Sequence, residues 1–287
     1  MKQLKIFSFI LITIFLFSCN EIDNPLKERT NTCGEDDINF PIRKILVEDY
    51  TGQTCGNCPE AAEILHKIKE DYCEHIIPLA VHVGFFAVPD PAHGFPADYR
   101  TEAGNELGEF FENDNALPNG LVNRAEFNEK IVLNRDEWRS AVDVLFSLLP
   151  DLTIEIESSY DENTNEISVK IISEIRTIIP EDVNLAVYLA ENNIISPQKD
   201  YSADPSYIEN YVHNHMLRKA VNGAFGEKIA SSLAAGDIIT KNYTFAANSE
   251  WVPENCEIVA FISYTDTKEI IQAESELVTI AKTLKTE

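Results

Sequence analysis

The sequence predicts an α/β domain over residues 41–150, followed by an antiparallel β-sandwich over residues 151–287. Two patterns lead to this fold class. The first stretch alternates buried strands with amphipathic helices, whereas the second repeats apolar residues at every other position. The length of 287 residues, with 44% hydrophobic residues, is enough for more than one core. We therefore expect two domains, preceded by a segment that belongs to neither.

Residues 1–18 have the features of a bacterial signal peptide. Lys2 and Lys5 form a positive start, and residues 6–17 form an apolar run that is too short to span a bilayer as a mature helix. The run closes in Leu16-Phe17-Ser18-Cys19, which resembles the lipobox of bacterial lipoproteins, so Cys19 is the expected acylation site. The alternative is a plain secretory signal that ends near a cysteine by chance.

Residues 19–40 are predicted to be the acylated cysteine and a flexible tether, because they are polar and lack apolar periodicity. Several acyl chains on Cys19 would anchor the protein stably in a lipid bilayer, whereas a single chain is marginal. Removal of the signal with its two lysines leaves 21 basic against 48 acidic residues, or a net charge of −27. Such a surface repels nucleic acid and anionic headgroups, so no nucleic-acid partner is expected.

Local spacing and turn signals define the elements of the α/β domain. The first strand ends at the turn signal Thr51-Gly52, Asn134 caps the last helix, and Pro150 ends that helix and marks the predicted domain boundary. The two long strands should be parallel neighbours, because a helix connects them. The predicted elements are, in order, a strand around 45–47, a helix over 61–72, a buried strand over 76–86, a loop over 87–99, a helix over 102–113, a short strand over 120–122 and a helix over 136–149.

Beyond Asp151 the apolar residues alternate with polar ones. Leu152, Ile154 and Ile156 pair in this pattern with the run that starts at Ile167, across a polar turn over 161–165, which predicts a β-hairpin. Further strands are expected over 185–190, 238–245, 257–264 and 270–280. A long excursion over 207–229 interrupts them and is predicted to hold a helix near 217–221.

Cys55-Gly56-Asn57-Cys58 follows a predicted strand and opens a predicted helix, the context in which a Cys-x-x-Cys pair has redox meaning. Unpaired backbone N–H groups at a helix N-terminus favour the thiolate of Cys55, and Cys58 lies one turn further in, where it can attack a mixed disulfide. Pro59 fits the first turn, where no N–H is needed. The motif predicts a thioredoxin-like domain.

The stretch from Glu48 to Glu60, EDYTGQTCGNCPE, resembles the opening of the outer membrane protein 28 related family of Bacteroidetes-type bacteria. The stretch from Tyr211 to Arg218, YVHNHMLR, resembles a second block of the same family, so the resemblance extends from about Ile42 to the C-terminus. The resemblance implies a lipoprotein with a thioredoxin fold followed by an immunoglobulin-like sandwich.

Two further residues match the pattern of a thioredoxin fold. Leu117-Pro118 before a short strand matches the cis-proline that faces the Cys-x-x-Cys motif and shapes a substrate groove, and the alternative is an ordinary trans turn proline. Asp49 matches the buried acid that accepts a proton from the resolving thiol. Glu48 is its rival, because neighbouring strand residues point to opposite faces and the sequence leaves open which face is inside.

The other cysteines and the histidines leave several alternatives open. Cys33, Cys73 and Cys256 make the number of non-lipidated cysteines odd, and a Cys33–Cys73 bridge is one option. His213 and His215 are weak candidates for metal ligands, because alternate residues of a strand share a face; without a third ligand, histidines in a packed turn are the favoured interpretation. His82 is expected to be a core histidine.

The leading hypothesis is a membrane-tethered thiol-disulfide oxidoreductase of a Gram-negative envelope, located at the outer membrane and facing the periplasm or the surface. Cys55 would be the nucleophile, Cys58 the resolving thiol, Asp49 the proton acceptor and Pro118 part of the substrate groove. Its partners would be the lipid bilayer and protein thiols or disulfides, with no cofactor. The alternative is a surface or periplasmic binding lipoprotein in which the Cys55–Cys58 disulfide is structural, and a third option is a metal-binding module.

Overall fold

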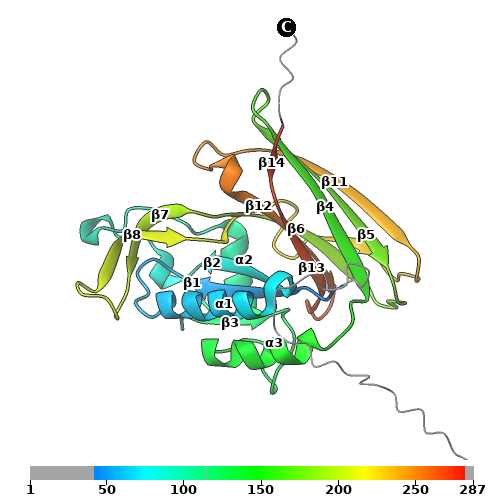
Figure 1. Ribbon diagram of the computed structural model, residues 1–287, viewed down its shortest axis with the longest axis horizontal. Coiled ribbons are helices and arrows are strands. Elements are labelled where there is room, and N and C mark those ends of the chain that lie inside the picture. The colour runs from blue at the N-terminus through cyan, green and yellow to red at the C-terminus, as the bar shows by residue number, and fades with distance from the viewer. Residues whose placement is uncertain (1–41, 115, 282–287) are drawn as a thin grey trace, which may run out of the picture. The chain divides into compact units, whose positions relative to one another are not determined.

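The computed structural model describes residues 42–114 and 116–281, and this part of the chain is mostly β-sheet (Figure 1). Three α-helices accompany fourteen strands within these ranges. None of the helices in the described residues is long and apolar enough to cross a membrane. The signal peptide, Cys19 and the tether lie outside the described residues.

One large mixed sheet runs through the molecule, with strand order β13-β12-β6-β9-β2-β1-β3 and with β10 paired to β6. Its strands are β1 (Ile45–Thr51), β2 (Ile76–His82), β3 (Asn119–Val122), β6 (Val183–Glu191), β9 (Met216–Ala220), β10 (Glu227–Ala230), β12 (Cys256–Tyr264) and β13 (Ile270–Leu277). The predicted parallel pairing of β1 and β2 is present, with Ile45 opposite Ile76. Strand β3 lies antiparallel to β1.

Strand β9 joins the two predicted halves. It runs parallel to β2, where the Ala80 N–H donates to the His215 carbonyl at 2.8 Å, and antiparallel to β6 on its other side. The expected fold class, a thioredoxin-like α/β domain followed by an immunoglobulin-like sandwich, is therefore wrong, because strands from both stretches share one sheet. Whether the chain on either side of residue 150 folds as a separate unit stays a prediction.

The second sheet has the order β11-β5-β4-β14, formed by β4 (Leu152–Asp161), β5 (Glu166–Ile175), β11 (Ile238–Ala246) and β14 (Thr279–Ile280). The hairpin expected across residues 161–165 is present as β4 and β5. Alternate residues of β4 point inward, so Leu152, Ile154 and Ile156 pack in one core with Val187 of β6 and Ile258 of β12.

Helices cover both faces of the large sheet near β1. Ile45 and Val47 pack in one cluster with α1 (Cys58–Tyr72) and α3 (Trp138–Phe146), whereas Leu46 and Tyr50 pack in another with α2 (Glu102–Phe110). This arrangement follows from the two-residue period of a strand, which sends neighbouring side chains to opposite faces. Asn134 is a helix cap, as expected, and it forms a capping box with Glu137 in the 3-10 turn Arg135–Glu137 that leads into α3.

A separate antiparallel hairpin is formed by β7 (Ile194–Lys199) and β8 (Tyr207–His213). It projects beside the region where β1 and α1 meet (Figure 1). Backbone hydrogen bonds hold it there: the N–H of Lys199 donates to the Gln53 carbonyl at 2.9 Å, and the N–H of Tyr201 donates to the Gly56 carbonyl at 2.9 Å. The hairpin therefore lies against the Cys-x-x-Cys motif.

Candidate functional site

Cys55 and Cys58 form a disulfide at the start of α1. The strand β1 ends at Thr51, a tight turn follows, and α1 begins at Cys58 with Pro59 in its first turn. Proline suits this position because its missing N–H has no partner there in any helix. The disulfide therefore joins the turn after β1 to the first residue of α1.

The β7–β8 hairpin covers this disulfide. The Gln198 side-chain amide donates to the carbonyls of Gly52 at 3.2 Å and Cys55 at 3.1 Å. The Tyr201 ring lies so close to Gly56 that a Cβ on that glycine would stand 2.7 Å from ring atoms. Cys55 and Cys58 are each only 2% exposed. The hairpin therefore contacts the backbone of the motif at Cys55 and Gly56 and covers it.

Sequence reasoning missed Gln198 and Tyr201 as part of this site. Gln198 contacts Cys55 across 143 positions of sequence. Periodicity and spacing describe residues that are close in sequence, so they give no signal for a contact at that separation.

The Leu117–Pro118 peptide bond is cis, as the sequence predicts. Pro118 directly precedes β3, whose Asn119 pairs with Tyr50 of β1. It is not among the residues that line the cavity described below. A role for Pro118 in a substrate groove stays a prediction.

Glu48 and Asp49 point to opposite faces of β1. Glu48 forms a buried two-point ion pair with Arg124, whose Nε and Nη2 lie 2.8 and 2.7 Å from its carboxylate oxygens. Tyr188 and Phe261 surround the guanidinium on that face. Asp49 points to the other face, toward α1, and so is the acidic residue of β1 beside the disulfide.

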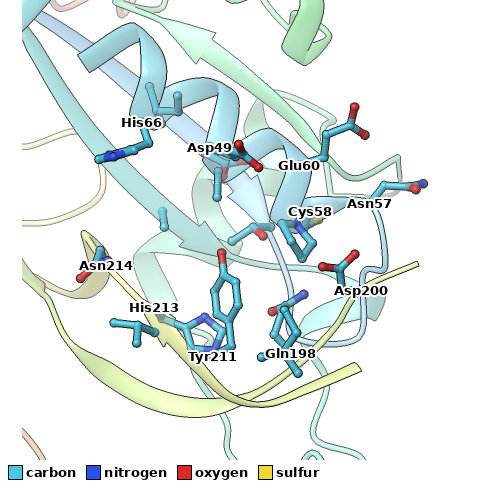
Figure 2. A pocket seen from close by; sticks show the side chains of 18 of the residues that line it. Asp49, Asn57, Cys58, Glu60, His66, Gln198, Asp200, Tyr211, His213 and Asn214 are labelled. Atoms are coloured by element: carbon cyan, nitrogen blue, oxygen red, sulfur yellow. The ribbon is translucent and has the colours of Figure 1, made fainter. Parts of the chain in front are cut away.

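A cavity of about 890 Å³ lies between α1, the ends of β1 and β2, and the β7–β8 hairpin. Figure 2 shows its labelled lining: the Asp49 carboxylate and the Tyr211 hydroxyl extend into the same space, and His213 lies beside Tyr211. Cys58 forms part of the wall, whereas Cys55 does not. The disulfide thus helps to shape the cavity.

Burial dominates the electrostatics of this cavity. It raises the pKa of Asp49 to about 7, and Oδ1 of Asp49 has no hydrogen-bond partner. It lowers the pKa of His213 to about 4 and that of His82 well below its usual range, so both imidazoles are neutral at pH 7. Burial and the nearby carboxylate of Asp49 raise the pKa of Tyr211 to about 12.

The two histidines considered as metal ligands have different surroundings. His213 ends β8 and lies within 5.6 Å of His82, measured between ring centroids. His215 Nδ1 lies 2.6 Å from Glu257 Oε1, and its backbone is left-handed. Among the residues that the structure describes, no group of three or more histidine, cysteine or acidic side chains is arranged to hold a metal ion.

Cys256 is a free cysteine buried in β12. Burial raises the pKa of its thiol to about 12, so it is not a reactive thiolate at neutral pH. Cys33 lies outside the described residues, and the Cys33–Cys73 bridge remains one option for that pair.

The residues above define a β-rich protein with a covered disulfide beside a polar cavity. A family model described as outer membrane protein Omp28 matches residues 110–282, more than half of the chain. The chain therefore belongs to the Omp28 family of outer membrane proteins, as the resemblance in its sequence indicated. No curated protein sequence matches it.

The chain is similar to several solved structures. HBP35 of Porphyromonas gingivalis matches with a TM-score of 0.63 at 16% identity, over 86% of this chain and 78% of that one. A protein of Agrobacterium tumefaciens matches with a TM-score of 0.49 at 14% identity, over 86% and 99%. A domain of the outer membrane lipoprotein Omp28 from P. gingivalis matches with a TM-score of 0.32 at 22% identity, over 47% and 93%. The HBP35 likeness spans both sides of residue 150 and shows the fold alone.

Proposed function

We propose that the chain is a ligand-binding lipoprotein of the outer membrane, acylated at Cys19, in which the Cys55–Cys58 disulfide is structural. The observation that carries this proposal is the β7–β8 hairpin, which covers the disulfide and forms one wall of the cavity beside it. A disulfide in this position fixes the turn between β1 and α1, which is the opposite wall.

Burial argues against rapid thiol-disulfide exchange. A thiolate must reach a sulfur atom along the disulfide axis, and the rate depends on access as well as on thiol pKa. Both cysteines are 2% exposed. Gln198 and Tyr201 donate hydrogen bonds to the backbone of the motif, at the carbonyls of Cys55 and Gly56. A protein substrate would first have to displace the hairpin.

The anchor is the second part of the proposal. Acylation of Cys19 would hold the protein at the bilayer, and the polar tether over residues 19–40 would separate the cavity from the membrane surface. The cavity of about 890 Å³ is in the size range of small-molecule sites.

The redox state of the pair tests the proposal. We would equilibrate the full chain in detergent with glutathione buffers, trap free thiols by alkylation and count them by mass spectrometry. We expect Cys55 and Cys58 to stay oxidised until denaturant is added, and the chain to reduce a model disulfide no faster than the Cys55→Ser variant. Ready reduction of the native pair, together with exchange that Cys55→Ser abolishes, would make the protein an oxidoreductase instead.

A further inference from the structure

We propose that the cavity between α1 and the β7–β8 hairpin binds an organic cation, an ammonium or guanidinium group, through the Asp49 carboxylate. This inference rests on the proposed binding function and names its ligand class. It is carried by the unpaired buried carboxylate and by the neutral hydrogen-bond acceptors beside it.

Asp49 lacks the partner that a buried carboxylate needs. Its side chain lines the cavity, the residue is 3% exposed, and Oδ1 has no hydrogen-bond partner. Two other carboxylates of the lining are already paired, Glu60 with Arg135 at 2.8 Å and Glu63 with Lys67 at 2.7 Å. Removing a carboxylate from water is costly unless a cation or donors compensate. A cationic ligand would supply that compensation.

The neighbouring side chains favour a ligand that donates hydrogen bonds. The Nε2 atom of His213 and the Nδ1 atom of His82 are buried without partners, and both residues line the cavity. Tyr211 adds an aromatic face 4.7 Å from the His213 ring, measured between centroids. Neutral imidazole nitrogens can accept N–H bonds, and aromatic faces attract cations. Ammonium and guanidinium groups carry donors and no acceptors, so they match this set.

The charge of the lining selects against anions. Asp49, Glu60, Glu63 and Asp200 line the cavity, whereas Lys69 is its one lysine or arginine. A metal ion is the other cationic class, but no trio of metal-binding side chains is arranged around a point within the described residues. The geometry therefore points to an organic cation rather than a bare metal.

Calorimetric titration of the full chain in detergent at pH 8 tests the proposal. The probes are the peptides acetyl-Ala-Lys-Ala-amide and acetyl-Ala-Arg-Ala-amide, with acetyl-Ala-Gln-Ala-amide as a neutral control and zinc chloride as a metal control. We expect a cationic peptide to bind at least about tenfold more tightly than the glutamine peptide, because loss of a buried charge partner costs that much or more. Asp49→Asn should remove this preference.

The matched control is Glu155→Gln, which removes one carboxylate from an exposed position of β4, on the other sheet. It should bind the cationic peptide as the wild type does. If Asp49→Asn fails to fold, Ala62→Trp offers a second test, because Ala62 lines the cavity from α1 and a large ring there should block the ligand.

Equal binding of the neutral and cationic peptides, unchanged binding by Asp49→Asn or Ala62→Trp, or binding of zinc alone would overturn the inference. These results leave the redox test of the proposed function unaffected. Conversely, a readily reduced disulfide would refute the proposed function while the calorimetry still reported on the cation site.

Discussion

Glu48 and Asp49 are adjacent acids in one strand, and the pleat of β1 gives them different roles. Glu48 is fully buried against Arg124, whereas Asp49 lines the cavity with an unpaired oxygen. The sequence predicts that one of the two lies beside the disulfide but not which one, because alternation fixes opposite faces without saying which face α1 covers. Ile45 and Val47 pack on α1 and α3, and Asp49 lies on the same face of β1 as these two residues. Asp49 is therefore the acid that lies beside the disulfide.

At the residue scale, Asp49→Asn should stabilise the folded protein at pH 8. The folded-state pKa of about 7 lies above the ordinary value of 3.8, so folding favours the protonated acid. That contribution is complete below pH 4 and is lost as the pH rises through 7, which amounts to roughly 4 kcal/mol at 1.36 kcal/mol per pKa unit. His213 and Tyr211, with pKa values of about 4 and 12, do not titrate near pH 7.

Urea unfolding of the wild type and Asp49→Asn at pH 4.5 and pH 8 measures this effect. The free energy of unfolding of the variant, minus that of the wild type, should be larger at pH 8 than at pH 4.5. Equal pH dependence in the two proteins would show that Asp49 is not held protonated by burial.

A second prediction at this scale concerns the buried ion pair. Arg124→Met leaves the Glu48 carboxylate without its partner in an apolar cluster, so we expect about 3–5 kcal/mol of destabilisation. The double variant Glu48→Leu/Arg124→Met should recover most of that loss, because it removes both charges. Chemical denaturation of the three proteins measures the effect. A double variant that is less stable than Arg124→Met would contradict this account.

At the scale of elements, spacing and turn residues correctly predicted the elements that depend on interactions between residues close in sequence. The strand, helix, strand order from β1 to β2, the Asn134 cap and the β4–β5 hairpin all follow from spacing and turn residues. The helix expected near residues 217–221 is wrong. Met216 to Ala220 are mostly good helix formers, but they form β9 between β2 and β6, where neighbouring strands supply the hydrogen bonds. Pairing with strands that are distant in sequence overrides helix propensity there. The hairpin that covers the disulfide was missed for the same reason, because its contacts with the motif are also distant in sequence.

The hairpin can be loosened without touching the cysteines. Gln198→Ala removes the side-chain amide that donates to Gly52, Cys55 and Lys199 carbonyls, so the hairpin should lift from the motif more often. We expect the rate of Cys55–Cys58 reduction by dithiothreitol to rise at least about tenfold, since loss of a few buried hydrogen bonds costs roughly 1–3 kcal/mol. Tyr207→Ala, at a 47% exposed position of the same hairpin, is the control. Equal reduction rates in the two variants would mean that another part of the fold shields the sulfurs.

At the scale of the whole molecule, the anchor and the folded part should be separable. Cys19→Ala removes the expected acylation site, and no described helix can span a bilayer. We expect the variant to fold but to leave the membrane fraction for the soluble fraction, with an unchanged circular dichroism spectrum. Persistence of the variant in washed membranes would indicate a second anchor.

The large sheet contains strands from before and after residue 150. Strands β1 and β2 pair through β9 with β6 and β12, and one core cluster joins Leu46 to Val259 and Phe261. Separate unfolding of the stretches before and after residue 150 would have to break this sheet and divide this core. The topology therefore predicts cooperative unfolding across the predicted domain boundary.

The two tryptophans test this cooperativity, because one lies on each side of residue 150. Trp138 is fully buried in α3, and Trp251 packs against the core between the two sheets. In Trp251→Phe, fluorescence reports on the surroundings of α3, and in Trp138→Phe it reports on the core beyond residue 150. Far-ultraviolet circular dichroism reports on both stretches, because the α-helices lie before residue 150 and most strands lie beyond it. The two signals should give one midpoint in urea, and the reciprocal variant Trp138→Phe should do the same at its own midpoint. Two resolved midpoints within one variant would mean that the stretches before and after residue 150 unfold separately, in spite of the sheet that they share.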